Sequence, residues 1–224
     1  MNTVLKNLIE AENKAKILFS EIEKRNLVQA GKSEKTLNDE VYDLAFELFG
    51  IKKFWHKRIV RAGKNTLCPY RENPPDLILR EEEIMFFDFG PVFDEWEADL
   101  GRTFVIGKNA NMLKMQADIE LAWHEGKEFY HANKNSLSGS DFYHFTKEMA
   151  LRYGWEFGHI HCGHLIGQFP HEKVLGEDTI NYIHHDNHEL MCNPDILGNE
   201  RHWIYEIHFV NLSLKIGGFY EQLL

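Results

Sequence analysis

The chain has 224 residues, 43% of them hydrophobic and 27% charged, with a formal net charge of −10. This length and composition suit a single domain with a sizeable apolar core. The negative charge argues against a nucleic acid or an anionic membrane as partner, because both require a cationic face.

Cysteine usage and the N-terminal residues bear on the compartment. The three cysteines contain no CxxC pair, which argues against a disulfide framework or a thiolate zinc site and favours a reducing environment: Cys68, Cys162 and Cys192. The first sixteen residues lack the apolar core of a signal peptide, and no stretch reaches the roughly 18 apolar residues of a membrane span. We therefore expect a soluble, cytoplasmic protein.

The first fifty residues predict two leading helices of a single domain that spans 1–224. Apolar residues recur at helical spacing over 3–28. A second amphipathic segment follows Ser33, a candidate N-cap, and Gly50 is a plausible stop.

The middle of the chain predicts a hairpin followed by two helices. IMFFDFGPVF (84–93) is a short, aromatic-rich apolar run typical of a buried strand, and EADLGRTFVIG (97–107) is the returning strand. Helical spacing resumes over 111–133 and 140–153, where Ser138 and Ser140 are candidate N-caps.

The last third changes character twice. The segment that follows Gly154 is rich in glycine and histidine, and then the sequence is irregular and polar to about Arg201. Strand-like alternation returns over 202–224 and predicts a terminal hairpin. Helix pairs and hairpins in this order indicate an α+β domain built on an antiparallel sheet.

Two aspartates stand at the ends of the first predicted hairpin. Asp88 closes the apolar run and Asp99 lies on the returning segment, so the hairpin would bring both carboxylates to one end of the sheet. Two acids at the edge of an aromatic core are costly unless they meet positive charge, such as a bridging metal ion. The structural alternative is that one caps the turn and the other pairs with Arg102.

Histidines and glutamates farther along the chain could complete such a site. In GHLIGQFPHE (163–172), glycines flank His164 and let the backbone approach a metal or substrate closely, and Pro170 fixes the entry of His171. Glu206 and Glu221 each interrupt an apolar strand-like run, fifteen residues apart, as suits neighbouring strands of one hairpin. The alternative is that either glutamate faces solvent from an edge strand.

Taken together, these residues resemble the metal-ligand signature of the creatinase and aminopeptidase ("pita-bread") metallopeptidases. Asp, Asp, His, Glu and Glu occur in that family's order, FDFGPVFDEWEADLGRTF carries its two aspartates eleven residues apart, and GHLIGQFPHE is similar to its GHGIG segment. The resemblance covers about 56–224, the region of the metal site. It implies a curved antiparallel sheet flanked by helices, closest in kind to Xaa-Pro aminopeptidase and prolidase catalytic domains. As a departure from the prolidases, we expect no separate N-terminal domain.

The resemblance also implies roles for individual residues. Two divalent ions, of manganese, cobalt, iron or zinc, would be held by Asp88, Asp99, His164, Glu206 and Glu221, with Asp99 and Glu221 bridging. Glu206 would also move a proton, and His171 would stabilise the oxyanion and face the substrate. Tyr70 and His161 are the further candidates for substrate contact.

Several positions depart from the family pattern. Tyr70 stands where the family usually has a histidine that assists substrate or leaving-group handling, and Ile207 follows Glu206 in place of proline. The segment 172–205 is unusually long and rich in histidine. Five histidines are rival candidates for the contacts assigned above: His159, His161, His184, His185 and His188.

The sequence therefore predicts a metal-dependent hydrolase of small peptides, of the aminopeptidase or dipeptidase kind with a preference for Xaa-Pro bonds. One alternative is a non-catalytic pita-bread module that binds a peptide or protein tail. Another is a creatinase-like hydrolase of a C–N bond in a small non-peptide substrate. A homodimer is the assembly we expect, since it is the commonest closed one.

Overall fold

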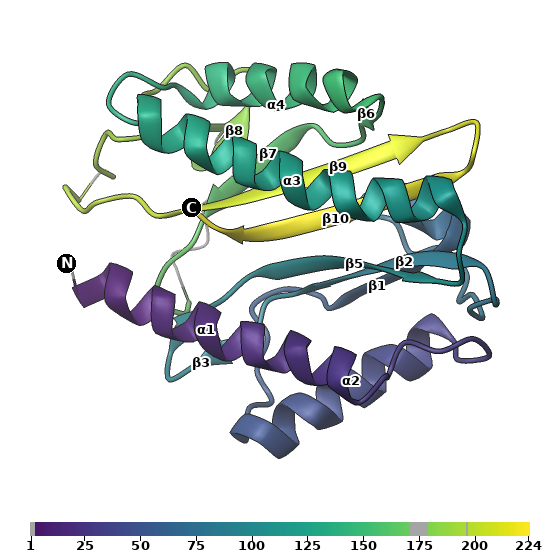
Figure 1. Cartoon of the computed structure of the whole chain (residues 1–224). Helices are drawn as coiled ribbons and strands as arrows, with labels where there is room; N and C mark the ends of the chain where they lie inside the picture. The colour runs from purple at the N-terminus through teal and green to yellow at the C-terminus, as the bar shows by residue number, and fades with distance from the viewer. Residues whose placement is uncertain (1–2, 171–178, 196) are drawn as a thin grey trace.

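The protein is organised around one antiparallel sheet of eight strands (Figure 1). The computed structural model describes residues 3–170, 179–195 and 197–224. The strand order is β1–β2–β5–β10–β9–β7–β8, and β6 pairs with β9. The strands are β1 (Ile59–Ala62), β2 (Glu83–Phe89), β5 (Leu100–Ile106), β6 (Glu156–Phe157), β7 (His161–Leu165), β8 (Tyr182–His184), β9 (Trp203–Asn211) and β10 (Ile216–Leu223).

Two helices precede the sheet, α1 (Thr3–Lys24) and α2 (Glu34–Phe49). The Ser33 side chain accepts a hydrogen bond from the Thr36 amide at the start of α2. Gly50 adopts a left-handed conformation with φ 69° and donates its N–H to the Phe46 carbonyl, which ends the helix. Both ends of α2 are therefore set by local chemistry that the sequence displays.

Two further helices, α3 (Ala110–Asn133) and α4 (Gly139–Tyr153), cover the C-terminal half of the sheet (Figure 1). Ser138 and Asp141 form a reciprocal capping box at the start of α4. Of the two candidate N-caps, Ser138 is the one that caps the helix, and Ser140 lies inside it.

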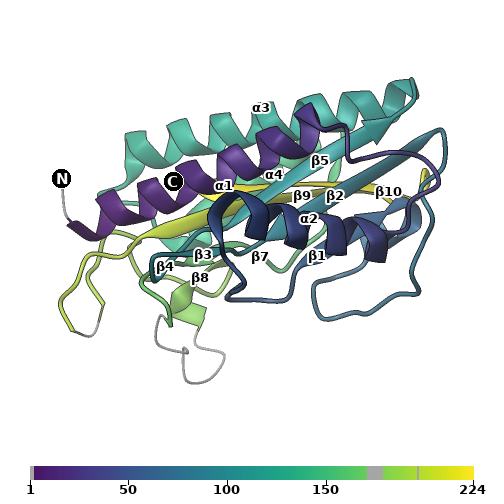
Figure 2. The ribbon, with the colours of Figure 1, turned by 90° about the horizontal axis from the view of Figure 1, so that it is seen from below.

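All four helices cover the same face of the sheet. Phe87 of β2 packs in one core with α1 and α2, and Tyr220 of β10 packs in another core with α3. Arg102 is the register partner of Phe87, and its guanidinium lies 3.8 Å from the centroid of the Tyr220 ring. These side chains therefore share the outer face, and alternate residues along the strands point to the inner face. Figure 2 shows α1 and α2 lying across β1, β2 and β5.

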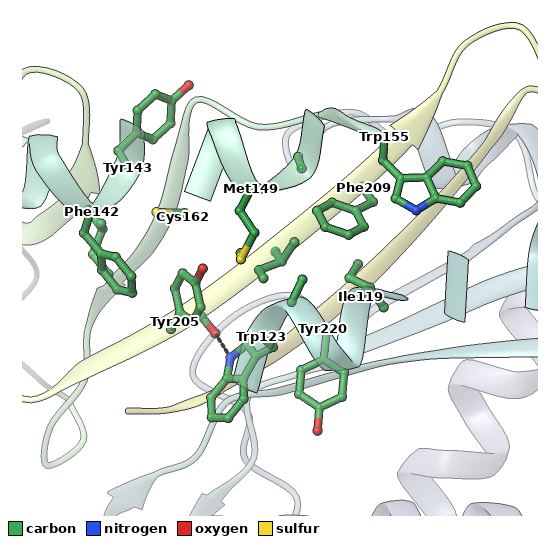
Figure 3. Close-up of a cluster of buried hydrophobic side chains, with 14 of the residues drawn as sticks. Ile119, Trp123, Phe142, Tyr143, Met149, Trp155, Cys162, Tyr205, Phe209 and Tyr220 are labelled. Carbon is green, nitrogen blue, oxygen red and sulfur yellow. Dashed lines mark hydrogen bonds between the residues drawn. The ribbon is translucent and has the colours of Figure 1, made fainter. Parts of the chain in front are cut away.

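The core beneath α3 and α4 holds β9 in place (Figure 3). The Trp123 indole of α3 donates to the Tyr205 carbonyl at 2.8 Å. Phe142 of α4 stacks on the Tyr205 ring with the centroids 4.6 Å apart. Tyr205 is fully buried, and its neighbour Glu206 is consequently presented on the opposite, inner face.

Both predicted hairpins and all four predicted helices are confirmed, with corrections at their edges. The first helix ends at Lys24 rather than near Val28. The loop of the first hairpin contains two short strands, β3 (Val92–Phe93) and β4 (Trp96–Glu97). Strand β1 was not predicted, and neither were β6 and β7 in the glycine- and histidine-rich segment or β8 in the irregular one. Among the residues that the structure describes, no helix is both long and apolar enough to span a membrane.

Gly126 provides a test of how tightly α3 packs on β9. A Cβ at this position would lie 2.3 Å from the Tyr205 Oη. Alanine is intrinsically a better helix former than glycine by about 1 kcal/mol, but overpacking a core costs about 1–3 kcal/mol. We expect Gly126→Ala to lower the free energy of unfolding, as measured by urea denaturation.

Glu128→Ala, at an exposed position on the same helix, is the control and should change stability by less than about 0.5 kcal/mol. A stabilised Gly126→Ala protein would show that the helix is not seated on Tyr205 as described.

Candidate metal centre

Three carboxylates lie in one row across the inner face of the sheet. Asp88 of β2 pairs in register with Gly101 of β5, Gly101 pairs with Glu221 of β10, and Glu221 pairs with Glu206 of β9. Register partners point to the same face. Gly101 leaves the space between the acids open, because a Cβ there would lie 2.5 Å from the Phe219 ring and 3.0 Å from the Cβ of Glu221.

Asp99 and His164 complete the group. Asp99 lies two residues before Gly101 and is 2% exposed. His164 comes from β7, where it pairs with Ile204 of β9, two residues before Glu206. The His164 Nε2 is 3.2 Å from the Asp99 Oδ2 and 3.6 Å from the Glu221 Oε1. The structure thus brings together all five residues that the resemblance implied as ligands.

The structural alternatives for these acids are wrong. Arg102 faces the outer side, where its guanidinium donates to the carbonyl of Glu221 at 2.9 Å and to the Gln222 side chain. Asp99 instead contacts two imidazoles. Glu206 and Glu221 are 6% and 2% exposed on inner strands, not on a solvent-facing edge.

Burial and mutual repulsion shift the pKa values of the acids apart. Burial, opposed by His56 and reinforced by Asp99, raises the pKa of Asp88 to about 7. Burial and the neighbouring Asp99 and Asp88 raise the pKa of Glu221 well above its usual range. Burial also opposes the charge on Glu206, but the nearby His161 outweighs it and lowers the pKa of that carboxyl. A site of this kind is stable with all acids ionised only if further positive charge enters it.

His56 is a site residue that the sequence interpretation missed. It precedes β1, and its Nε2 lies 3.0 Å from the Asp99 Oδ1 and 3.5 Å from the Asp88 Oδ1. Burial opposes protonation of His56, but Asp99 and Asp88 outweigh it and raise the pKa to about 9. The only sequence signal is a histidine between an aromatic and a basic residue in FWHKR, and nothing in that pattern marks a ligand.

His159 and His161 lie on the other side, against Glu206. The His161 Nδ1 is 2.7 Å from the Glu206 Oε1, and the His159 Nδ1 is 3.6 Å from the same oxygen. Burial, partly offset by Glu206, lowers the pKa of His159 to about 4. His161 is therefore placed beside the candidate ligands, and His159 joins it as a neutral imidazole.

The remaining candidates lie at the margin or elsewhere. Tyr70 is 41% exposed, and its ring centroid is 6.0 Å from that of His56. His184 and His185 form a separate group with Asp186, apart from the central carboxylates. His171 lies outside the described residues, so its predicted roles stay predictions.

The donor set fits divalent metal ions. Three groups of donor atoms meet within coordination distance of one another: His56 with Asp88 and Asp99, Asp99 with His164 and Glu221, and His159 with His161 and Glu206. Three buried donor atoms have no hydrogen-bond partner among the described residues: His161 Nδ1, Glu206 Oε1 and Glu221 Oε2. The first two are 2.7 Å apart without hydrogen-bond alignment.

Fold and site together define a metallopeptidase-like domain of the pita-bread class, and the comparison with known families agrees. The model of Metallopeptidase family M24 matches residues 6–206. The chain belongs to this family. The α+β pita-bread fold expected from the sequence is confirmed by the solved structures that it resembles.

Individual relatives are distant. A putative Xaa-Pro aminopeptidase of Mycoplasma pneumoniae is 23% identical over 176 residues, which cover 77% of this chain and 48% of that protein. The crystal structure of a dipeptidase from Pyrococcus horikoshii OT3 superposes with a TM-score of 0.74 at 21% identity, covering 96% of this chain and 55% of that one.

An X-Pro aminopeptidase from Thermotoga maritima MSB8 superposes with a TM-score of 0.75 at 17% identity, covering 97% of this chain and 56% of that one. The chain thus spans about half the length of these relatives. At such identities the structural likeness establishes the fold.

Metal binding should be visible in thermal unfolding. A ligand that binds only the folded state at 100 times its Kd stabilises it by about 2.7 kcal/mol. We expect Mn²⁺ added to chelator-treated protein to raise the melting temperature by several degrees, and Asp99→Asn to remove that rise because Asp99 belongs to two of the donor groups.

The control is His144→Asn, an exposed residue of α4, which should behave as the unmodified chain. An equal rise in the Asp99→Asn protein would exclude the inner face as the metal site.

Proposed function

We propose that this protein is a metal-dependent hydrolase of small peptides, with an Xaa-Pro aminopeptidase or dipeptidase activity that uses two divalent ions. The observation that carries the proposal is the convergence of four carboxylates and His164 on one buried patch of the inner face. The family and the names of its relatives support the bond type. Mn, Co, Fe and Zn all suit this mixture of oxygen and nitrogen donors.

Two ions, when bound, supply a polarised scissile carbonyl and a water whose pKa is low enough for attack near neutral pH. Asp88, Asp99, His164, Glu206 and Glu221 would hold them. Bridging by Asp99 and Glu221 agrees with their central position, since Glu221 lies between Asp88 and Glu206 in the row.

Glu206 is the residue best placed to move a proton. Burial opposes ionisation of Glu206, but the neighbouring His161 outweighs it and lowers the pKa of this carboxyl. As a carboxylate it would accept a proton from the attacking water and pass it to the leaving amine. His161, 2.7 Å away, would orient this carboxylate and contact the substrate.

Substrate would enter past Tyr70. The Tyr70 hydroxyl accepts a hydrogen bond from the Lys57 amide at 3.2 Å, so the ring forms part of the rim beside His56. His171 is proposed to face the substrate and stabilise the oxyanion, as the family resemblance implies.

A non-catalytic binding module is the second candidate, and Tyr70 is the observation that favours it. A phenol cannot take over the proton chemistry of the usual histidine at neutral pH, and burial raises the pKa of Tyr70 further. A creatinase-like hydrolysis of a non-peptide C–N bond would use the same donors and differ only in substrate.

A peptide panel separates these candidates. We expect metal-loaded protein to release the N-terminal residue from Xaa-Pro dipeptides or Xaa-Pro-Yaa tripeptides, detected by amine release. Glu206→Gln should lower kcat by about 10² to 10⁴, the usual contribution of a general base, while His144→Asn should keep full activity.

A protein that binds metal but turns over no peptide in the panel would contradict the peptidase proposal. Retention of a peptide without cleavage would then support the binding module, and release of an amine from creatine or a similar small amide would support the third candidate.

A further inference from the structure

His56 and His164 are held in the same way on opposite sides of Asp99. The Nδ1 of His164 is 2.9 Å from the carbonyl of Leu165, and the Nδ1 of His56 is 2.8 Å from the carbonyl of Lys57. A carbonyl oxygen only accepts, so each Nδ1 carries the hydrogen. In the neutral ring the lone pair is then on Nε2, the arrangement usual in metal-binding histidines.

Both Nε2 atoms face carboxylate oxygens, and each takes a different oxygen of Asp99. His164 lies 3.2 Å from Oδ2 and His56 lies 3.0 Å from Oδ1. His56 is also 3.5 Å from Asp88, as His164 is 3.6 Å from Glu221. An imidazole whose Nε2 faces two carboxylates either carries a second proton there or shares a cation with them.

The spacings suit shared coordination. Two donors bound at about 2.1 Å to one ion, at angles between octahedral and tetrahedral, lie roughly 3.0–3.4 Å apart. The Nε2 of His56 is 3.0 and 3.5 Å from its two oxygens, a pattern close to that of His164.

We propose that His56 is a sixth protein ligand. It donates Nε2 to the ion held by Asp88 and Asp99, as His164 does to the other ion, so that each ion has one imidazole. This proposal rests on the two-ion site of the proposed function and adds a residue that is outside the five implied by the family resemblance.

Contacts of the neighbouring residues hold the His56 ring in this position. Its neighbour Trp55 donates from the indole to the Ala98 carbonyl at 3.1 Å and from the backbone to the Gly90 carbonyl at 2.9 Å. Gly90 makes room for the ring, since a Cβ there would lie 2.2 Å from the His56 Cδ2. The His56 side chain is 9% exposed, which leaves little rotamer freedom to lose on binding an ion.

An imidazole ligand on each ion should change which divalent metals the site binds most tightly. Carboxylate-only sites suit Mg and Mn, whereas added imidazole favours Zn and Fe. We therefore expect His56→Asn to weaken Zn²⁺ and Co²⁺ binding more than Mn²⁺ binding.

The test measures metal binding without reference to activity. Chelator-treated protein is dialysed against Co²⁺, and bound metal is counted by elemental analysis and followed by the visible absorption of Co²⁺. We expect two ions per unmodified chain and per His144→Asn chain. His56→Asn should keep one ion and bind the second about 100-fold more weakly, by analogy with the 10–100-fold cost of losing even an outer-shell partner.

The outcomes separate the two proposals. Equal binding of both ions by His56→Asn and His144→Asn overturns the role of His56 and leaves the two-ion site intact. No ion bound by the unmodified chain overturns both. If His56→Asn fails to fold, an anomalous map of a Zn²⁺-soaked crystal of the unmodified chain decides: an ion about 2.1 Å from the His56 Nε2 supports the proposal, and an ion beyond about 3 Å refutes it.

Discussion

Repulsion among four buried carboxylates is the constraint on which the rest of this structure depends. Asp88, Asp99, Glu206 and Glu221 are all largely removed from water, where an ionised acid loses most of its solvation. An imidazole nitrogen lies within 3.6 Å of each of the four and satisfies part of the charge. Burial, together with the neighbouring acids, still raises the pKa of both Asp88 and Glu221.

The fold tolerates this cluster because the two large apolar cores and the acids lie on opposite faces of the sheet. Helices α1 to α4 bury the outer face, and Phe87 and Tyr220 lie in its two cores. The row from Asp88 to Glu206 on the inner face instead presents carboxylates. Antiparallel register then decides which residues meet, because a slip of one position would turn each acid toward the apolar cores.

Sequence alone predicted much of this arrangement. Alternation in 202–224 and the apolar run that ends at Asp88 placed the acids on strands, and the caps at Ser33 and Gly50 marked α2 closely. The strand register was beyond it, since pairing of β10 with β5 joins residues more than a hundred positions apart. Strands β6 to β8 were missed because their short runs are interrupted by glycine and histidine, which weaken the alternating pattern.

The histidines show why local pattern fails at such a site. His164 was recognised because glycines flank it in a familiar motif, whereas His56 has no such neighbours and is brought to Asp99 only by the packing of Trp55 against Gly90. Tyr70 belongs to the same local assembly, since its hydroxyl accepts the amide of Lys57, the residue next to His56. The imidazole of His56, from a different segment, therefore lies beside Tyr70, with the ring centroids 6.0 Å apart. Because the Tyr70 hydroxyl binds the backbone next to His56, the phenol helps to hold the segment that carries this histidine to the site.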